Sequence, residues 1–155
     1  MKFIGTLLVL LICGVTGHQP AMSSSAFGQA KVPAAKPKVE LISADELKTK
    51  LAKNEPVTII DVRASQAYAD SDTKIKGAIH VKLRRLKSRL AFPPLNRVPR
   101  DREIITYCAC PSEETSLAAA QVLVDAGFKR VRALKGGWDG WRKVNGQVEA
   151  RPKAT

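Results

Sequence analysis

Two kinds of hydrophobic pattern alternate along residues 39–148. Short runs of β-branched and other apolar residues, typical of strands, are each followed by a segment whose apolar positions recur every three or four residues, typical of helices. The predicted strands are 39–42, 57–62, 76–81, 103–108 and 130–134. The predicted helices follow Ser43, cover 65–71, 82–90 and 115–127, and end with a short helix in the Gly- and Trp-rich stretch 136–141.

Strands 57–62 and 103–108 are apolar along nearly their whole length. Such runs are buried on both faces, which is typical of central strands in a parallel sheet. Together with the strand–helix alternation, they predict an open α/β domain with a parallel sheet and helices on both faces. Ligands of such domains bind beyond the carboxyl ends of the strands. Cys108 is predicted at this edge.

The first thirty residues have the pattern of a signal peptide. Lys2 precedes an apolar run from Phe3 to Val15, which is too short for a comfortable membrane span but suits the core of a leader. Gly28-Gln29-Ala30 places small residues where a signal peptidase reads them, so we expect residues 1–30 to be removed. Lipid attachment at Cys13 and retention of the leader as a membrane anchor are the alternatives.

Composition divides the rest of the chain. Residues 31–38 are rich in Pro and Lys and are predicted to be a linker, residues 39–148 the folded domain, and 149–155 a tail. The formal net charge of +12 is interpreted as a solvated basic surface that aids solubility, with attraction of anionic partners as the alternative. No nucleic-acid motif or basic groove with interleaved aromatic residues is found, so we expect no nucleic-acid partner. The cations of segment 82–90 are interpreted as the solvated face of an amphipathic helix.

Cys108 and Cys110 would be the only cysteines of the mature chain once the leader is removed. A disulfide between them would close a tiny loop and would constrain the fold very little. Export would also take these thiols out of the reducing cytosol. Because they lie in a strand-to-helix loop, backbone N–H groups and the helix dipole can stabilise a thiolate there. The two cysteines are therefore expected to have a chemical role and not a structural one.

Four segments carry a family resemblance: "IIDVRASQAY", "KGAIHV", "IITYC" and "VRALKGGWDGW". They occur in the order seen in rhodanese-like domains, and the chain resembles this family over residues 39–148. The resemblance implies an open five-stranded parallel sheet with helices on both faces. It also implies a sulfurtransferase, in which a cysteine takes a sulfane sulfur from a donor, becomes a persulfide and passes the sulfur to a nucleophilic acceptor.

What the resemblance implies about partners is equally specific. The partners would be a small sulfur-containing donor and a thiol acceptor, with no metal and no organic cofactor. We expect an exported monomer in the periplasm or cell envelope. It would meet a membrane only if the leader is retained or lipidated.

The reactive loop departs from the usual family pattern, which has a Gly and an Arg before a Ser. Here Glu113 and Glu114 occupy the loop, and carboxylates repel an oxyanion donor such as thiosulfate. The predicted substrate-binding loop consists of Ala109, Cys110, Pro111, Ser112, Glu113, Glu114, Thr115 and Ser116. Its layout also resembles that of cell-cycle dual-specificity phosphatases, but Glu114 stands where their arginine would stabilise the transferring phosphoryl group, which disfavours a phosphatase.

The position of the nucleophile depends on the direction of counting. Counted from the strand, Cys108 matches the family cysteine, whereas Cys110 has the usual spacing to Ser116. We assign Cys108 as the nucleophile, with Cys110 as the alternative or relay thiol, because a central strand fixes position better than a helix start. Asp61 and Arg63 are predicted to support the site as a salt bridge and loop anchor.

Three functions remain from the sequence. The first is an exported sulfurtransferase that works through a cysteine persulfide. The second is a thiol–disulfide oxidoreductase or sulfur relay that uses both thiols. The third is a catalytically silent rhodanese-like binding module.

Overall fold

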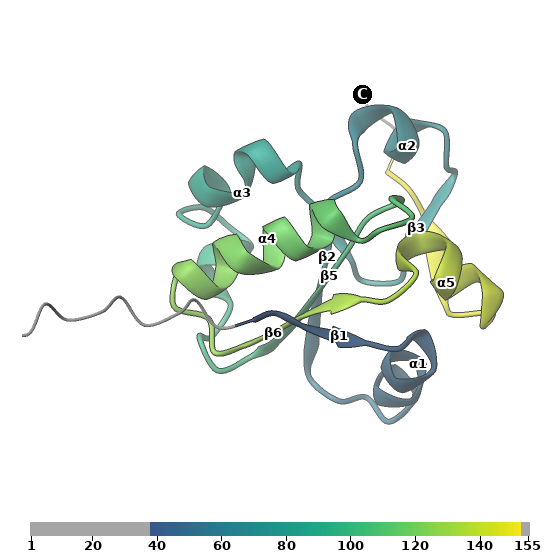
Figure 1. The fold of residues 1–155 in the computed structure, drawn as a ribbon, viewed down its shortest axis with the longest axis horizontal. Helices are drawn as coiled ribbons and strands as arrows, with labels where there is room; N and C mark the ends of the chain where they lie inside the picture. The colour runs from purple at the N-terminus through teal and green to yellow at the C-terminus, as the bar shows by residue number, and fades with distance from the viewer. Residues whose placement is uncertain (1–37, 153–155) are drawn as a thin grey trace, which may run out of the picture. The chain divides into compact units, whose positions relative to one another are not determined.

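The computed structural model describes residues 38–152. The predicted signal peptide, the linker up to residue 37, and residues 153–155 lie outside this range, so their assignments stay predictions. The core of the described unit is a five-stranded parallel sheet with strand order β1-β6-β5-β2-β4 (Figure 1). Its strands are β1 (Glu40–Ile42), β2 (Val57–Asp61), β4 (Ile79–His80), β5 (Glu103–Tyr107) and β6 (Arg130–Leu134). This confirms the predicted fold class.

Helices cover both faces of the sheet, as Figure 1 shows. They are α1 (Ala44–Ala52), α2 (Ser65–Ala69), α3 (Leu83–Arg89), α4 (Glu114–Asp125) and α5 (Gly137–Lys143), with one 3-10 turn at Leu95–Arg97. Helices α3 and α4 pack on one face, and α1 and α5 on the other. Neighbouring strand residues point to opposite faces, so Ile104 joins the first core and Ile105 the second. This explains why the central strands are apolar at successive positions.

Two short strands had no visible signal in the sequence. β3 (Thr73–Ile75) pairs antiparallel with β7 (Val148–Ala150) in a separate two-stranded sheet. The predicted tail begins at residue 149, whereas the structure pairs Glu149 and Ala150 with β3.

The predicted strand 76–81 is also shorter than expected. Gly77 has φ 75° and lies in a turn in which the Ala78 amide donates to the Ile75 carbonyl at 3.0 Å. Only Ile79 and His80 then pair with β2. The strand begins only at Ile79 because this hydrogen bond holds residues 75–78 in the turn.

The carboxyl ends of β2, β4 and β5 meet at one edge of the sheet. Beyond the strands, the amide of Val62 donates to the Tyr107 carbonyl and the amide of Val81 to the Asp61 carbonyl, both at 2.9 Å. These bonds hold the segments that follow the three strands next to one another, and the segment after β5 begins with Cys108. None of the helices between residues 38 and 152 has both the length and the apolar character of a membrane span.

Candidate functional site

Cys108 lies directly after β5 and is only 1% exposed. The amide of Cys110 donates to the Cys108 Sγ at 3.3 Å, and the Cys108 thiol lies 3.8 Å from the Ser116 Oγ. The Ser116 hydroxyl donates to the carbonyl of Glu113 at 2.8 Å. Burial raises the pKa of the Cys108 thiol, and the nearby amides and hydroxyl only partly offset this. In this environment the Cys108 thiol therefore stays protonated more readily than an ordinary cysteine does.

Cys110 has a different environment, although it is only two residues away. It is half-buried, and its thiol donates to the Thr115 Oγ1 at 3.1 Å in the first turn of α4. Burial raises the pKa of this thiol, but its hydrogen bonds with the Cys108 thiol and with the hydroxyl and amide of Thr115 outweigh that effect. The pKa of Cys110 is therefore held below its ordinary value, and Cys110 is the thiol of the pair that ionises first.

The two loop glutamates also differ. Glu113 has the left-handed φ of 53° immediately before α4, and its Oε1 accepts a hydrogen bond from the amide of Gly136 at 2.6 Å. It thus links the reactive loop to the turn before α5. Glu114 is exposed, and its charge raises the pKa of Cys110. From the sequence, both carboxylates were expected to face a sulfur donor. In the structure, the Glu113 carboxylate instead binds the turn before α5.

A close backbone contact fixes the strand end that carries Cys108. The amide of Trp138 donates to the Cys108 carbonyl at 2.8 Å. Gly137 has φ 49°, and a Cβ at this position would overlap the Cys108 carbonyl oxygen. Only glycine combines this backbone conformation with so close an approach. Sequence reasoning missed this role, although the two consecutive glycines at 136 and 137 were a visible signal.

Behind the loop lies a buried polar network. Asp61, Arg63 and Tyr107 are all 0% exposed. The Arg63 guanidinium binds the Asp61 carboxylate, with Nη2 and Oδ2 2.8 Å apart, as the sequence predicted. The Tyr107 hydroxyl donates to the same Oδ2 at 2.6 Å. Burial, followed by the charge of Asp61, raises the pKa of Tyr107, so the phenol stays neutral and donates.

Tyr107 was not assigned a role from the sequence. A tyrosine at the end of a buried strand is the signal that could have indicated it, because its hydroxyl needs a partner. The Arg63 guanidinium also lies 4.6 Å from the centroid of the Trp138 ring and 5.1 Å from that of Tyr68. Since Arg63 is enclosed by rings and neutralised by Asp61, it does not replace the arginine missing from the loop.

Among the loop residues predicted to bind substrate, Ala109, Pro111 and Ser112 are exposed, whereas Thr115 and Ser116 contact the two thiols. The structure thus brings Cys108, Cys110, Thr115 and Ser116 together, while Asp61 and Arg63 lie behind the strand end. Within residues 38–152, no three His, Cys, Asp or Glu side chains are placed to share a metal ion.

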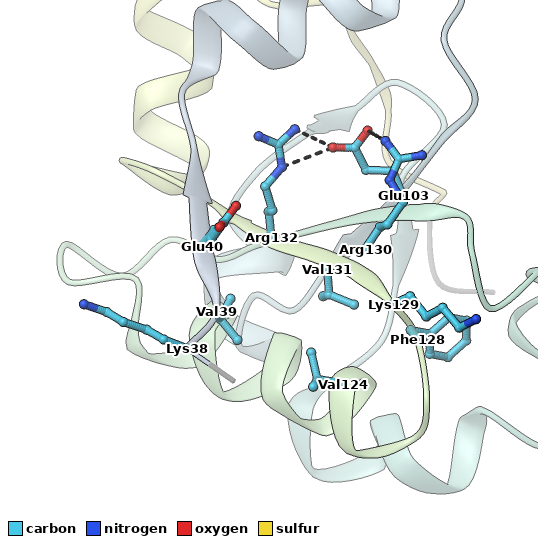
Figure 2. Close-up of a pocket in the computed structure, with 10 residues that line it drawn as sticks. All are labelled: Lys38, Val39, Glu40, Glu103, Val124, Phe128, Lys129, Arg130, Val131 and Arg132. Carbon is cyan, nitrogen blue, oxygen red and sulfur yellow. Dashed lines mark hydrogen bonds and ion pairs between the residues drawn. The ribbon is translucent and has the colours of Figure 1, made fainter. Parts of the chain in front are cut away.

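A hollow of about 600 Å³ lies at the amino ends of β1 and β6, at the opposite end of the strands from the thiols (Figure 2). Its lining includes apolar side chains such as Val131 and the carboxylate of Glu103. Glu103 binds Arg130 at 3.3 Å and also pairs with Arg132 (Figure 2). Because its buried carboxylate is already neutralised and no thiol is near, this hollow is not the candidate reactive site.

Comparisons with known proteins point to one family. The family model described as "Rhodanese-like domain" matches residues 43–144. A sulfurtransferase from Allochromatium vinosum is 28% identical over 105 residues, which cover 68% of this chain and 90% of that protein. The thiosulfate sulfurtransferase GlpE of Actinobacillus pleuropneumoniae is 32% identical over 99 residues, which cover 64% of this chain and 83% of that protein.

Solved structures agree with the sequence comparisons. The crystal structure of the Alr3790 protein from Anabaena sp. has a TM-score of 0.60 and 33% identity, and the match covers 70% of this chain and 91% of that one. The BH2092 protein from Bacillus halodurans has a TM-score of 0.60 and 30% identity, with 73% and 77% covered.

Proposed function

Because the chain belongs to the rhodanese-like domain family, we propose that it is an exported sulfurtransferase that carries a sulfane sulfur as a cysteine persulfide. The observation that carries this proposal is the position of Cys108 at the carboxyl edge of the sheet. There the amide of Cys110 donates to its Sγ, and the first turn of α4 supplies Ser116. The amide donor suits a thiolate or an anionic persulfide, which are the two charged forms in the reaction.

The chemical steps follow from this arrangement. The cysteine thiolate attacks the outer sulfur of a sulfane donor, a new S–S bond forms, and the donor's own S–S bond breaks with its electron pair leaving on the donor. An acceptor thiolate then attacks the outer sulfur of the persulfide. The S–S bond to the protein breaks, its electron pair returns to the cysteine sulfur, and the acceptor leaves as a persulfide. No net oxidation of the protein occurs.

The different environments of the two thiols support a division of labour. Cys108 is the buried carrier, and Cys110 is the relay thiol that meets solvent and ionises more easily. As a thiolate, Cys110 can take the proton from Cys108 or exchange the sulfur with it. The thiol pair also favours a second candidate, a thiol–disulfide oxidoreductase.

Intact mass measured after incubation with a sulfane donor tests both candidates. The gain of one sulfur supports transfer, and the loss of two hydrogens on oxidation supports the second candidate. Cys108→Ser should block stable persulfide formation, whereas Cys110→Ser should slow it. If Cys108→Ser still gains sulfur and Cys110→Ser does not, the assignment of the carrier is reversed.

The charge of the loop bears on the donor. Within residues 108–116 there is no Lys or Arg, and the exposed Glu114 adds a negative charge. We therefore propose a donor with less negative charge than thiosulfate. A double change, Glu113→Gly with Glu114→Arg, should raise thiosulfate use, but it would also remove the contact with Gly136. The single change Glu114→Arg is therefore the cleaner test.

Export rests on the leader pattern of Lys2, the apolar run to Val15 and Gly28-Gln29-Ala30. A C-terminally tagged chain should be recovered from the periplasm or cell envelope, and its first residue should be near Lys31. Recovery of full-length soluble protein from the cytosol would contradict the proposed location.

A further inference from the structure

The segment from residue 73 to residue 100 carries cations but no carboxylates. Every charged residue from Thr73 to Arg100 is a Lys or an Arg. In the structure, Lys82, Arg85 and Arg89 line a hollow of about 420 Å³, together with His80 and Val81. We call this feature the α3 hollow. Its volume lies within the range of sites that bind small molecules or side chains.

The cations of the α3 hollow are not neutralised within the described part of the chain. Elsewhere in residues 38–152, Lys50 and Arg132 bind carboxylates. By contrast, Lys82 and Arg85 contact no carboxylate there, and Arg89 donates to the carbonyl of Pro93 at 3.2 Å. Several like charges around one concave surface produce a positive potential that attracts anions.

The α3 hollow opens at the same sheet edge as the thiols. Val81, in its wall, hydrogen-bonds to the end of β2, and the residue after β2 hydrogen-bonds to Tyr107, next to Cys108. Two strand spacings separate β4 from β5, which corresponds to about 10 Å. Helix α3 also packs against α4, and Val81, Leu86 and Cys108 belong to one apolar cluster. The hollow and the thiols therefore lie at the same edge of the sheet, on segments that follow strands two spacings apart.

We infer that the α3 hollow binds an acidic segment of a polypeptide that carries the acceptor thiol. This inference rests on the proposed function. Thiosulfate is a single tetrahedral group and cannot span about 10 Å, whereas an extended peptide covers that distance in about three residues. The exposed cations Arg84 and Lys87 lie on the same helix and add to its positive charge.

The charge of the loop determines where the acidic residues of the acceptor must lie relative to its thiol. Glu114 repels carboxylates from the immediate surroundings of the thiols, while the α3 hollow attracts them on one side. An acceptor whose thiol is separated from its acidic residues by a short neutral spacer satisfies both conditions. The reverse arrangement, with carboxylates next to the thiol, does not.

The test uses the full chain and two peptides, Cys-Gly-Gly-Glu-Glu-Glu and Cys-Gly-Gly-Gln-Gln-Gln, as sulfur acceptors. Wild-type protein loaded with sulfur should transfer to the acidic peptide with kcat/KM about tenfold higher, because two or three exposed ion pairs each contribute a factor of about two to five. Arg85→Glu with Arg89→Glu should abolish this preference. Transfer to neutral dithiothreitol should be unchanged.

A matched control separates local from overall charge. Lys38→Glu with Lys129→Glu changes the net charge equally, but these exposed residues lie at the amino edge of the sheet. This double variant should keep the preference for the acidic peptide. Equal loss of preference in both double variants would overturn the inference, because overall charge would then explain the effect.

Binding is measured separately, with a fluorescent acidic peptide in which Ser replaces Cys. Weaker binding to the Arg85→Glu, Arg89→Glu variant alone supports the inference, even if the protein forms no persulfide and the proposed function fails. Normal transfer to dithiothreitol without any preference for the acidic peptide overturns the inference and leaves the proposed function standing. Anionic phospholipid vesicles or nucleic acid that bind the hollow in place of the peptide would also overturn it.

Discussion

The contact between Gly137 and the end of β5 gives the sharpest test of how the fold holds the thiols. In Gly137→Ala, the new Cβ would overlap the Cys108 carbonyl oxygen, and the backbone would keep an unfavourable φ of 49°. The left-handed conformation costs about 1–2 kcal/mol for alanine. Relief of the overlap moves the turn away from β5, which weakens the hydrogen bond from the Trp138 amide, worth about 1 kcal/mol. Strain in the surrounding packing adds about 1–3 kcal/mol.

Gly127 provides the matched control. It also has a positive φ, 91°, but a Cβ there would meet no atom within 4 Å. Gly127→Ala should therefore show only the cost of the backbone conformation. We expect Gly137→Ala to lower the free energy of unfolding in urea by about 2–4 kcal/mol more than Gly127→Ala does. It should also slow persulfide formation, because the Cys108 carbonyl must move. Equal destabilisation by both changes would refute the argument from close approach.

Three further predictions concern the loop and the network behind it. Glu114→Arg should raise thiosulfate:cyanide sulfurtransferase activity about fivefold after solvent screening, with Glu114→Gln intermediate; unchanged rates in folded variants would contradict the role of loop charge. Cys110 should be alkylated at lower pH than Cys108, because its pKa is lowered and that of Cys108 is raised; peptide mass spectrometry across a pH series would show the opposite order if the assignment is wrong. Tyr107→Phe should cost about 2 kcal/mol of unfolding free energy, since it removes a hydrogen bond to the Asp61 carboxylate; a loss below about 0.5 kcal/mol in urea unfolding would show that the network is unimportant for stability.

The sequence by itself determined the fold class and the position of Cys108 directly after a central strand. Strand-forming runs such as Val57–Val62 and helical periods such as that around Leu86 are local patterns, and each predicted its element correctly. The order of the four family segments indicated the rhodanese-like family, which the family model confirmed. The pair Asp61 and Arg63 could also be predicted, because the two residues are only two positions apart at the end of β2.

The tertiary structure decided what depends on contacts between distant segments. Glu113 and Gly136 are 23 positions apart, and no local pattern indicates that one carboxylate of the loop is engaged. The unlike pKa values of Cys108 and Cys110 depend on burial under α3 and α4 and on the first turn of α4. The physical reason is the same in each case: periodicity records which face of an element is buried, whereas hydrogen bonds and desolvation depend on which other element covers that face.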